Sequence, residues 1–246
     1  MGDGLQKAFN SMKIKGISYA WILILLAIIA CDSETKKVDP EALGYHYYPV
    51  QVGDYRIYDI QDITFTLLEG ADTNNYQLKE VVHDYYQQNQ DDTTYYLYRY
   101  SRNPQTEEEW NLDSVWTVRK DARRVIVMEN NIPYIKLVFP FQTGQSWDAN
   151  GMNAEEPSFY TISKTGENFH NGDQSYESTV TVVEKNNMDT VIQERYSEAV
   201  YAAEVGLVYR ELRYIDYCAT TVECLGLGII EGGRKYVQQL TEYGKE

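Results

Sequence analysis

The sequence of 246 residues is poor in basic residues, in proline and in histidine, and it contains only one long apolar run. Lys and Arg number 22 against 37 Asp and Glu, which gives a formal net charge of −15. Nucleic-acid binding requires clustered basic side chains that neutralise phosphates, so this balance argues against a nucleic-acid partner. The three histidines, His46, His83 and His170, show no spacing typical of a metal site or a catalytic centre. We therefore predict no metal, no cofactor and no enzymatic activity.

The apolar run at residues 19–30 is too short to cross a membrane as a helix, which needs about twenty apolar residues. Lys13 and Lys15 precede the run, and the small residue Ala30 closes it. A basic flank, a short apolar stretch and a small final residue are typical of a secretory signal. Such a signal also predicts Met12, which directly precedes the basic flank, as the natural start.

Residues 28–31, with the sequence Ile-Ile-Ala-Cys, resemble the lipobox of bacterial lipoproteins. The resemblance implies cleavage before Cys31 and transfer of a diacylglyceryl group to its sulfur. The alternative is an uncleaved N-terminal anchor with an incidental cysteine. Removing residues 1–30 takes away three Lys and one Asp, which changes the formal net charge from −15 to −17. Anionic lipid repels such a chain, so we expect acyl chains, and not a basic patch, to hold it at the membrane.

Three segments follow from these patterns. Residues 1–30 are the predicted lipoprotein signal peptide, and residues 31–44 are polar, contain a proline and have the character of a tether. Residues 45–246 fit a single domain in length. The predicted location is the cell envelope, with a lipid anchor in the outer membrane. The predicted partners are the membrane and an unknown envelope protein or glycan.

Residues 45–246 are rich in tyrosine and β-branched residues, which favour strands. Apolar and polar residues alternate with period two in several segments, and turn residues separate these segments. We therefore predict an all-β fold, a single antiparallel sheet-rich domain in the form of a curved sheet, a barrel or a sandwich. The predicted strands cover residues 55–60, 63–67, 75–86, 94–101, 114–120, 123–129, 133–141, 176–185, 190–196, 206–215 and 234–243.

Some local predictions are specific enough to be tested by the structure. Asp121-Ala122 predicts a two-residue hairpin turn, and Asn130-Asn131 and residues 186–189 predict further turns. Residues 234–243 also place three apolar side chains on one helical face, but the preceding Gly232-Gly233 and the alternation favour a strand.

Residues 133–141 are almost continuously apolar, which predicts a strand in the centre of the sheet. Residues 135–139 should then be among the most buried, because they are apolar on both faces. We expect an aspartate at Leu137 to unfold the domain, since it would bury an unpaired charge.

Cys218 and Cys224 enclose five residues, and exported thiols meet an oxidising compartment. We predict a disulfide between them, with Cα atoms about 4.4–6.8 Å apart. Metal or redox chemistry is the alternative, although no CxxC spacing and no neighbouring histidine support it.

Two surface features are candidate sites. Residues 94–101 place Tyr96, Tyr98 and Tyr100 on one face of a strand and Tyr95 on the other, so these rings could stack on a flat ligand or simply pack on the sheet. Three tripeptides resemble the Asp-Ser/Thr-apolar O-glycosylation sequon of exported Bacteroidota proteins. The residues that would carry the glycan are Thr93, Ser114 and Thr190.

Two further motifs are incomplete. Residues 148–151 resemble the beginning of a calcium loop, but their glycine comes too early and no glutamate stands at the twelfth position. Residues 144–148 resemble a nucleophile elbow without its second glycine. Neither motif predicts a site.

Residues 47–58, 129–140, 144–148 and 205–211 together are similar to a group of uncharacterised lipoproteins from Bacteroidota. The resemblance covers most of residues 45–243. It implies export and a β-rich fold, and it brings no activity and no catalytic residues.

Three functions remain open at the level of sequence. The first is a membrane-anchored, non-enzymatic domain that binds a partner or ligand or has a structural role. The second is a carrier of an apolar ligand or lipid in a curved antiparallel sheet, which requires an apolar concave face without a polar plug. The third is a hydrolase in which two carboxylates converge in a cleft.

Overall fold

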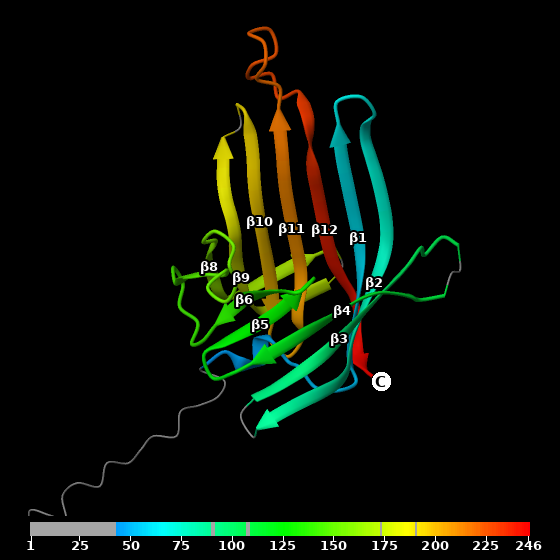
Figure 1. Ribbon diagram of the computed structural model, residues 1–246, viewed down its shortest axis with the longest axis vertical. Helices are drawn as coiled ribbons and strands as arrows, with labels where there is room; N and C mark the ends of the chain where they lie inside the picture. Colours follow the sequence, from blue (N-terminus) through cyan, green and yellow to red (C-terminus); the bar gives the residue numbers. More distant parts are fainter. Residues whose placement is uncertain (1–42, 90–91, 107–108, 173, 190) are drawn as a thin grey trace, which may run out of the picture. The chain divides into compact units, whose positions relative to one another are not determined.

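The computed structural model describes residues 43–246 apart from residues 90–91, 107–108, 173 and 190 (Figure 1). No helix in this part of the chain is long and apolar enough to cross a membrane. The elements are a 3-10 turn, η1 (Tyr45–Tyr47), and the strands β1 (Asp54–Thr66), β2 (Gly70–Asn89), β3 (Asp92–Arg102), β4 (Asn111–Lys120), β5 (Arg124–Glu129), β6 (Ile132–Val138), β7 (Ser146–Asp148), β8 (Phe159–Asn171), β9 (Gln174–Asp189), β10 (Gln193–Ala202), β11 (Gly206–Tyr217) and β12 (Ile230–Lys245).

All twelve strands belong to one antiparallel sheet with the order β6-β5-β4-β3-β2-β1-β12-β11-β10-β9-β8-β7. Every pair in this order joins strands that are consecutive along the chain, except the pair of β1 and β12, and the consecutive strands β6 and β7 are not paired. The sheet curves until it is nearly closed into a barrel, with its two edges at β6 and β7. The predicted all-β fold and the single antiparallel domain are therefore confirmed.

The two edges of the sheet meet through a few hydrogen bonds and not through a ladder. The amide of Ile135 in β6 donates to the carbonyl of Ala149 at 2.9 Å, and the indole of Trp147 donates to the carbonyl of Ile135 at 2.8 Å. The side chain of Asn153 donates to the carbonyl of Pro133 at 2.8 Å. These bonds satisfy backbone groups that an open edge would expose.

The prediction that residues 133–141 form a central strand is wrong, because β6 is the edge strand of the sheet. The prediction of deep burial is nevertheless confirmed, and Leu137 is 0% exposed. Continuous apolar sequence reports burial on both faces. β6 has a paired strand on one side only. The opposite edge of the curved sheet buries it in place of a second paired strand.

The main apolar core lies between the two halves of the curved sheet. In Figure 1, β3–β6 cross in front of the lower ends of the taller strands β9–β12. Inward-pointing residues of both layers meet there. The buried members of this core are Tyr47, Val82, Leu97, Val118, Val125, Val127, Leu137, Phe139, Ala149, Tyr160, Ile162, Val180, Val182, Ala199 and Tyr201.

A second apolar cluster links β1, β2, β10, β11 and β12, and Phe169 in β8 and Tyr176 in β9 pack against it. The ring of Phe169 in β8 packs on Tyr209 with centroids 5.5 Å apart. Gln174 in β9 donates a hydrogen bond to the carbonyl of Thr241 in β12 at 3.0 Å. The adjoining ends of β8 and β9 therefore pack against β11 and β12.

Several local predictions need correction. Residues 159–171 form the unpredicted strand β8, which contains His170. Residues 186–189 lie inside β9, and the chain turns only after Asp189, because the β9–β10 ladder continues to the pair of Asp189 and Gln193. The loop at Asp121 has three residues instead of two, and the Asp121 carboxylate accepts hydrogen bonds from the amides of Arg123 and Arg124.

Other local predictions are confirmed. Asn130 and Asn131 both have positive φ, as a tight turn between β5 and β6 requires. Residues 234–243 lie in strand β12 and not in a helix. Residues 55–60 and 63–67 largely merge into the single strand β1.

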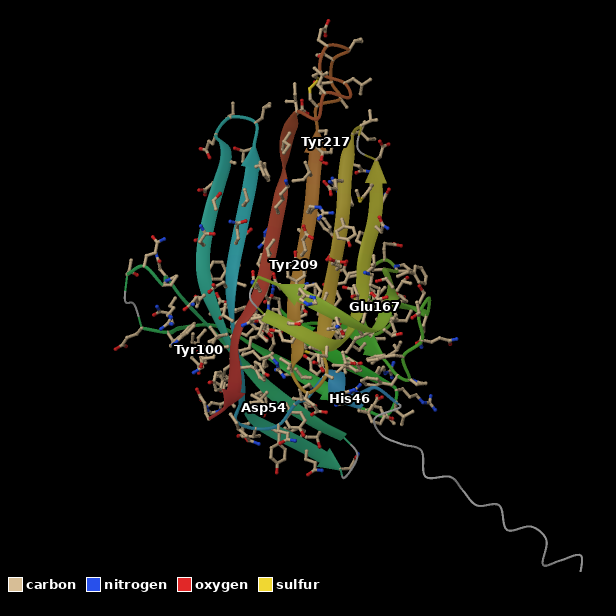
Figure 2. The ribbon with its side chains drawn as sticks, turned by 180° about the vertical axis from the view of Figure 1, so that it is seen from behind. His46, Asp54, Tyr100, Glu167, Tyr209 and Tyr217 are labelled. Carbon is tan, nitrogen blue, oxygen red and sulfur yellow. A yellow bond between two sulfur atoms is a disulfide. The ribbon has the colours of Figure 1, made fainter. Side chains whose placement is uncertain are left out.

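The connections at one end of the tall strands are mostly apolar and exposed. We define the distal loops as residues 67–69, 191–192 and 218–229. Figure 2 shows Tyr217, at the start of the longest distal loop, at the opposite end of the tall strands from His46. The exposed aliphatic residues of these loops are Leu67, Leu68, Val191, Ile192, Val222, Leu225, Leu227 and Ile229.

Candidate functional site

A cavity of about 350 Å³ lies between the two layers, next to the apolar core. Residues from β1, β2, β3, β4, β5, β6, β10, β11 and β12 line it. The charged members of the lining are Arg56, Glu80, Arg99, Glu129, Lys136, Arg210 and Arg234. We call this space the interior cavity.

Strand register brings three of the charged residues into a row. Arg56 in β1 lies opposite Glu80 in β2, and Glu80 lies opposite Arg99 in β3. Opposed residues of an antiparallel pair project from the same face of the sheet, so all three side chains point inward. Arg99 Nε donates to Glu80 Oε1 at 3.0 Å, and its guanidinium carbon lies 3.6 Å from the ring centroid of Trp116.

A second ionic cluster joins β5, β6, β9 and β11. Lys136 Nζ lies 2.7 Å from Glu129 Oε1 and 4.0 Å from Glu184 Oε1. Arg210 and Ser197 donate to Glu184 Oε2 at 3.0 and 2.8 Å. Charges removed from water are costly unless they are paired, and this cluster pairs each of its charged groups.

The electrostatics of this cluster keep its carboxyls ionised. Burial alone would raise the pKa values of Glu129 and Glu184, but the charges of Lys136 and Arg210 outweigh burial and hold both pKa values below the ordinary 4.5. Both carboxyls are therefore charged near neutral pH.

Arg56 is bound differently from the other cations. Its Nε donates to the carbonyl of Val205 at 2.6 Å and its Nη2 to the carbonyl of Pro49 at 2.9 Å. Among the described carboxylates, none forms an ion pair with it. Gly206 has a φ of +94°, and a Cβ there would come within 3.0 Å of the Arg56 guanidinium. Glycine at position 206 thus makes room for this buried cation.

Two residues that line the cavity hold a buried donor without an acceptor, namely Gln238 Nε2 and Trp116 Nε1. Gln238 is only 3% exposed, and its Oε1 accepts from the Tyr236 hydroxyl at 3.0 Å. A buried donor without a partner is costly, and such groups are found where a ligand or water completes the site.

Tyrosine rings form much of the cavity wall. Burial raises the pKa values of Tyr48, Tyr58 and Tyr201, so their hydroxyls stay protonated at any physiological pH. The Tyr58 hydroxyl donates to the carbonyl of Leu207 at 3.2 Å. The wall therefore combines flat apolar faces with neutral hydroxyl groups.

The predicted tyrosine stripe is split between the two faces of β3. Tyr95 packs against the core, while Tyr96 is exposed on the outer face. Tyr98 stacks on the exposed His83 with ring centroids 4.4 Å apart and lies 6.4 Å from Tyr100. The structure thus forms an outer row of rings, and stacking on a ligand there stays a prediction.

The predicted covalent sites are spread along the chain. Cys218 and Cys224 form a disulfide with a Cα separation of 5.7 Å, inside the expected range. Thr93 lies in β3 and Ser114 in β4, where the Ser114 hydroxyl donates to Asp113 Oδ2 at 3.0 Å. Cys31 and Thr190 lie outside the described residues, so lipidation and O-glycosylation stay predictions.

Residues that sequence analysis set aside have structural roles. Asp148 Oδ1 accepts from the amides of Asn150 and Ser158 at 3.0 and 2.9 Å, so it braces a loop. The ring of His46 lies 4.4 Å from that of Tyr47, and its Nδ1 is buried without a partner. Among the described residues, no group of three His, Cys, Asp or Glu side chains could hold a metal ion.

Sequence analysis missed the interior cavity. Its signal is a charged residue in phase with the buried positions of a strand, as Arg56 is with Tyr58 and Ile60, and Arg99 is with Leu97. Lys136 likewise interrupts the apolar sequence of β6. Such charges mark a polar interior, but which of them meet depends on strand register.

Comparison with known proteins gives distant structural similarity only. No family model and no curated protein matches the chain. A protein from Bacteroides fragilis, described as exported and as having a YmcC-like fold, aligns over 79% of this chain and 98% of its own, with 10% identity and a TM-score of 0.40. A protein from Parabacteroides distasonis, described as a lipoprotein, aligns over 81% and 98%, again with 10% identity and a TM-score of 0.40. Similarity at this level assigns no function.

Proposed function

We propose that the chain is a lipid-anchored protein of the cell envelope that acts by binding and not by catalysis. Its binding site is the interior cavity. The observation that carries this proposal is a cavity of about 350 Å³ whose lining combines ionic side chains, tyrosine rings and unpartnered donors. Ligand sites in proteins are concave, largely preformed and equipped with a few such polar groups.

The anchor follows from the sequence around Cys31. The lipobox resemblance implies a diacylglyceryl group on this residue, and the strongly acidic chain argues against attachment to a lipid surface through a basic patch. The outer membrane is the proposed destination. The polar residues 31–44 then serve as a tether for the β domain.

The ionic cluster around Lys136 supports binding over hydrolysis. Two carboxylates, Glu129 and Glu184, converge there, as a hydrolase would require. Acid catalysis needs one carboxyl with a raised pKa, whereas both of these have lowered values.

The carrier of an apolar ligand or lipid loses support. That function needs an apolar concave face, and the concave face here holds the row of Arg56, Glu80 and Arg99. An apolar ligand in the cavity would displace water from these charged groups and would offer them no hydrogen bond in return.

The proposal is tested on full-length protein purified from the envelope of a native-type host in a non-ionic detergent. Mass spectrometry should find an acylated N-terminal Cys31, and denaturation should release a small molecule that is chemically unchanged after incubation with fresh protein. A Leu212→Trp variant, which fills part of the cavity, should release none while keeping its melting temperature. A mature chain that retains residues 19–30, or equal release from the variant, would contradict the proposal.

A further inference from the structure

We propose that the ligand of the interior cavity is a small anion that carries one ring, with its acidic group bound at Arg56 and its ring against the tyrosine wall. This inference rests on the proposed function, because it names the chemical class of the ligand for the same site. It makes the cavity an anion-selective site inside a strongly acidic protein.

The charge of the lining favours an anion. Five cations line the cavity against two carboxylates, Glu80 and Glu129. Two further carboxylates lie behind the lining. Glu184 forms ion pairs with Lys136 and Arg210, and Asp62 forms an ion pair with Arg234. One positive charge remains in excess even when both are counted. The whole chain, by contrast, has a formal net charge of −15.

Arg56 is the cation that accounts for this excess. It is 8% exposed, and its hydrogen bonds go to the carbonyls of Val205 and Pro49, which orient the guanidinium but do not neutralise it. A buried cation without a carboxylate partner attracts an anion more strongly than an exposed cation, because little water screens the interaction.

The unpartnered donors of the lining also favour an anionic ligand. Gln238 Nε2 and Trp116 Nε1 are both buried N–H groups that lack an acceptor. An acidic group offers two or more acceptor oxygens, and hydrogen bonds to a charged acceptor are stronger than those to a neutral one. Carboxylates and phosphates share this property, so both belong to the proposed class.

The size and walls of the cavity set the rest of the ligand. A volume of about 350 Å³ is near the lower limit of ligand pockets, about 300 Å³, which favours a molecule with one ring. Tyr48, Tyr76 and Tyr236 are partly exposed in the lining, so they offer flat faces on which such a ring can pack.

The test measures the affinity of the full-length protein in non-ionic detergent for two matched pairs of probes by titration calorimetry. The pairs are glucuronate with glucose, and benzoate with benzyl alcohol. At least one anion should bind about tenfold or more tightly than its neutral partner, and the pair that shows this identifies the ring as a sugar or an aromatic. Equal affinity within both pairs, or no binding of any probe, would overturn the inference.

Variants then locate the anion within the cavity. Arg56→Gln should lower the affinity for the preferred anion about tenfold or more, whereas Arg56→Lys should keep most of it. Arg123→Gln makes the same charge change on an exposed side chain and should change nothing. Equal affinities of the Arg56→Gln and Arg123→Gln variants would contradict the role of Arg56.

A second variant covers the possibility that Arg56→Gln fails to fold. Gln238→Glu keeps the acceptor for the Tyr236 hydroxyl and adds a negative charge to the lining. It should weaken binding of the anion about tenfold while affecting its neutral partner less than twofold. Equal loss for both would show that charge does not govern the site. A small molecule released from wild-type protein alongside equal affinity for anion and neutral probe would leave the proposed function intact and remove only this inference.

Discussion

The region around the interior cavity and the distal loops distribute charged and apolar residues in opposite ways. Around the cavity the sheet is two layers thick, and it buries Arg56, Glu80, Lys136 and Glu184. At the distal loops the side chains that meet solvent are aliphatic, with Leu68 95% exposed and Val222 89% exposed. Proteins usually do the reverse.

This difference indicates which contacts stabilise the fold and which regions remain available for a function. Buried ion pairs recover little more than the cost of their own desolvation, so the cavity is not a source of stability. The aliphatic distal side chains contact little protein and contribute equally little. Stability must come from the apolar core between the layers, and both unusual regions are available for function.

The largest expected effect concerns that core. Leu137→Asp buries a charge without a partner at a fully buried position, so it should lower the free energy of unfolding by more than about 4 kcal/mol or prevent folding. Urea unfolding followed by circular dichroism measures this. Leu67→Asp makes the same change at a distal residue and should cost less than about 0.5 kcal/mol. Similar losses for both variants would remove the distinction between the two regions.

The ionic cluster should be next in size. Glu184→Gln removes the carboxylate that Arg210, Ser197 and Lys136 share, so it leaves buried cations poorly neutralised. We expect a loss of about 3 kcal/mol in the free energy of unfolding. The control is Glu167→Gln, because Glu167 forms only an exposed pair with Lys164 and should contribute less than about 0.5 kcal/mol.

The same cluster should make stability depend on pH. The folded pKa values of Glu129 and Glu184 lie below the unfolded value of 4.5, so their contribution is complete above pH 4.5 and is lost as the pH falls through the lowered values. Unfolding free energies measured between pH 7 and pH 3 should fall most steeply below 4.5. A double variant, Glu129→Gln with Glu184→Gln, should fall less steeply, and an unchanged slope would contradict this assignment.

The disulfide should have a smaller effect. It closes a short loop, with a sequence separation of 6, and the chain-entropy estimate for such a loop is about 2 kcal/mol. A Cys218→Ser, Cys224→Ser variant should therefore melt at a lower temperature, and adding reductant should lower the melting temperature of wild type alone. Ligand affinity should not change, since the loop lies at the distal end.

The smallest effect on stability belongs to the distal aliphatic residues themselves. Leu68→Ser with Val222→Ser removes two highly exposed side chains and should leave the unfolding free energy within about 0.5 kcal/mol of wild type. Retention on a hydrophobic-interaction column should fall clearly. Leu78→Ser, at a buried position, provides the contrast, because it should destabilise the fold by several times as much.

Much of the fold could be predicted from local pattern. Alternation with period two and paired asparagines located most strands and the turn at Asn130-Asn131, because both depend on neighbouring residues alone. The edge position of β6 could not be predicted, since the cover of Leu137 comes from residues that are distant in sequence. β8 was missed because residues 163–168 are polar and exposed on both faces, so they show no alternation of burial.

The candidate site was less predictable than the fold. A charged residue in phase with the buried positions of a strand indicates a polar interior. The row of Arg56, Glu80 and Arg99, however, depends on the register of three strands. The ladder between β2 and β3 contains bulges, and each bulge changes which face later residues occupy. Gln238 and Lys136 reach the same cavity only because the sheet curves until its layers meet.

The pairing of β1 with β12 has a consequence for the time course of folding. Asp54 pairs with Lys245 and Tyr58 with Leu240, so this ladder joins the first and the last strand along the described chain. Every other ladder can form between neighbours along the chain as soon as they are available, whereas this one must wait for β12. Closing so large a loop is slow, and until it closes β1 and β11 each present a free edge. Premature association through those edges, and not loss of the finished fold, is then the main hazard while the chain folds.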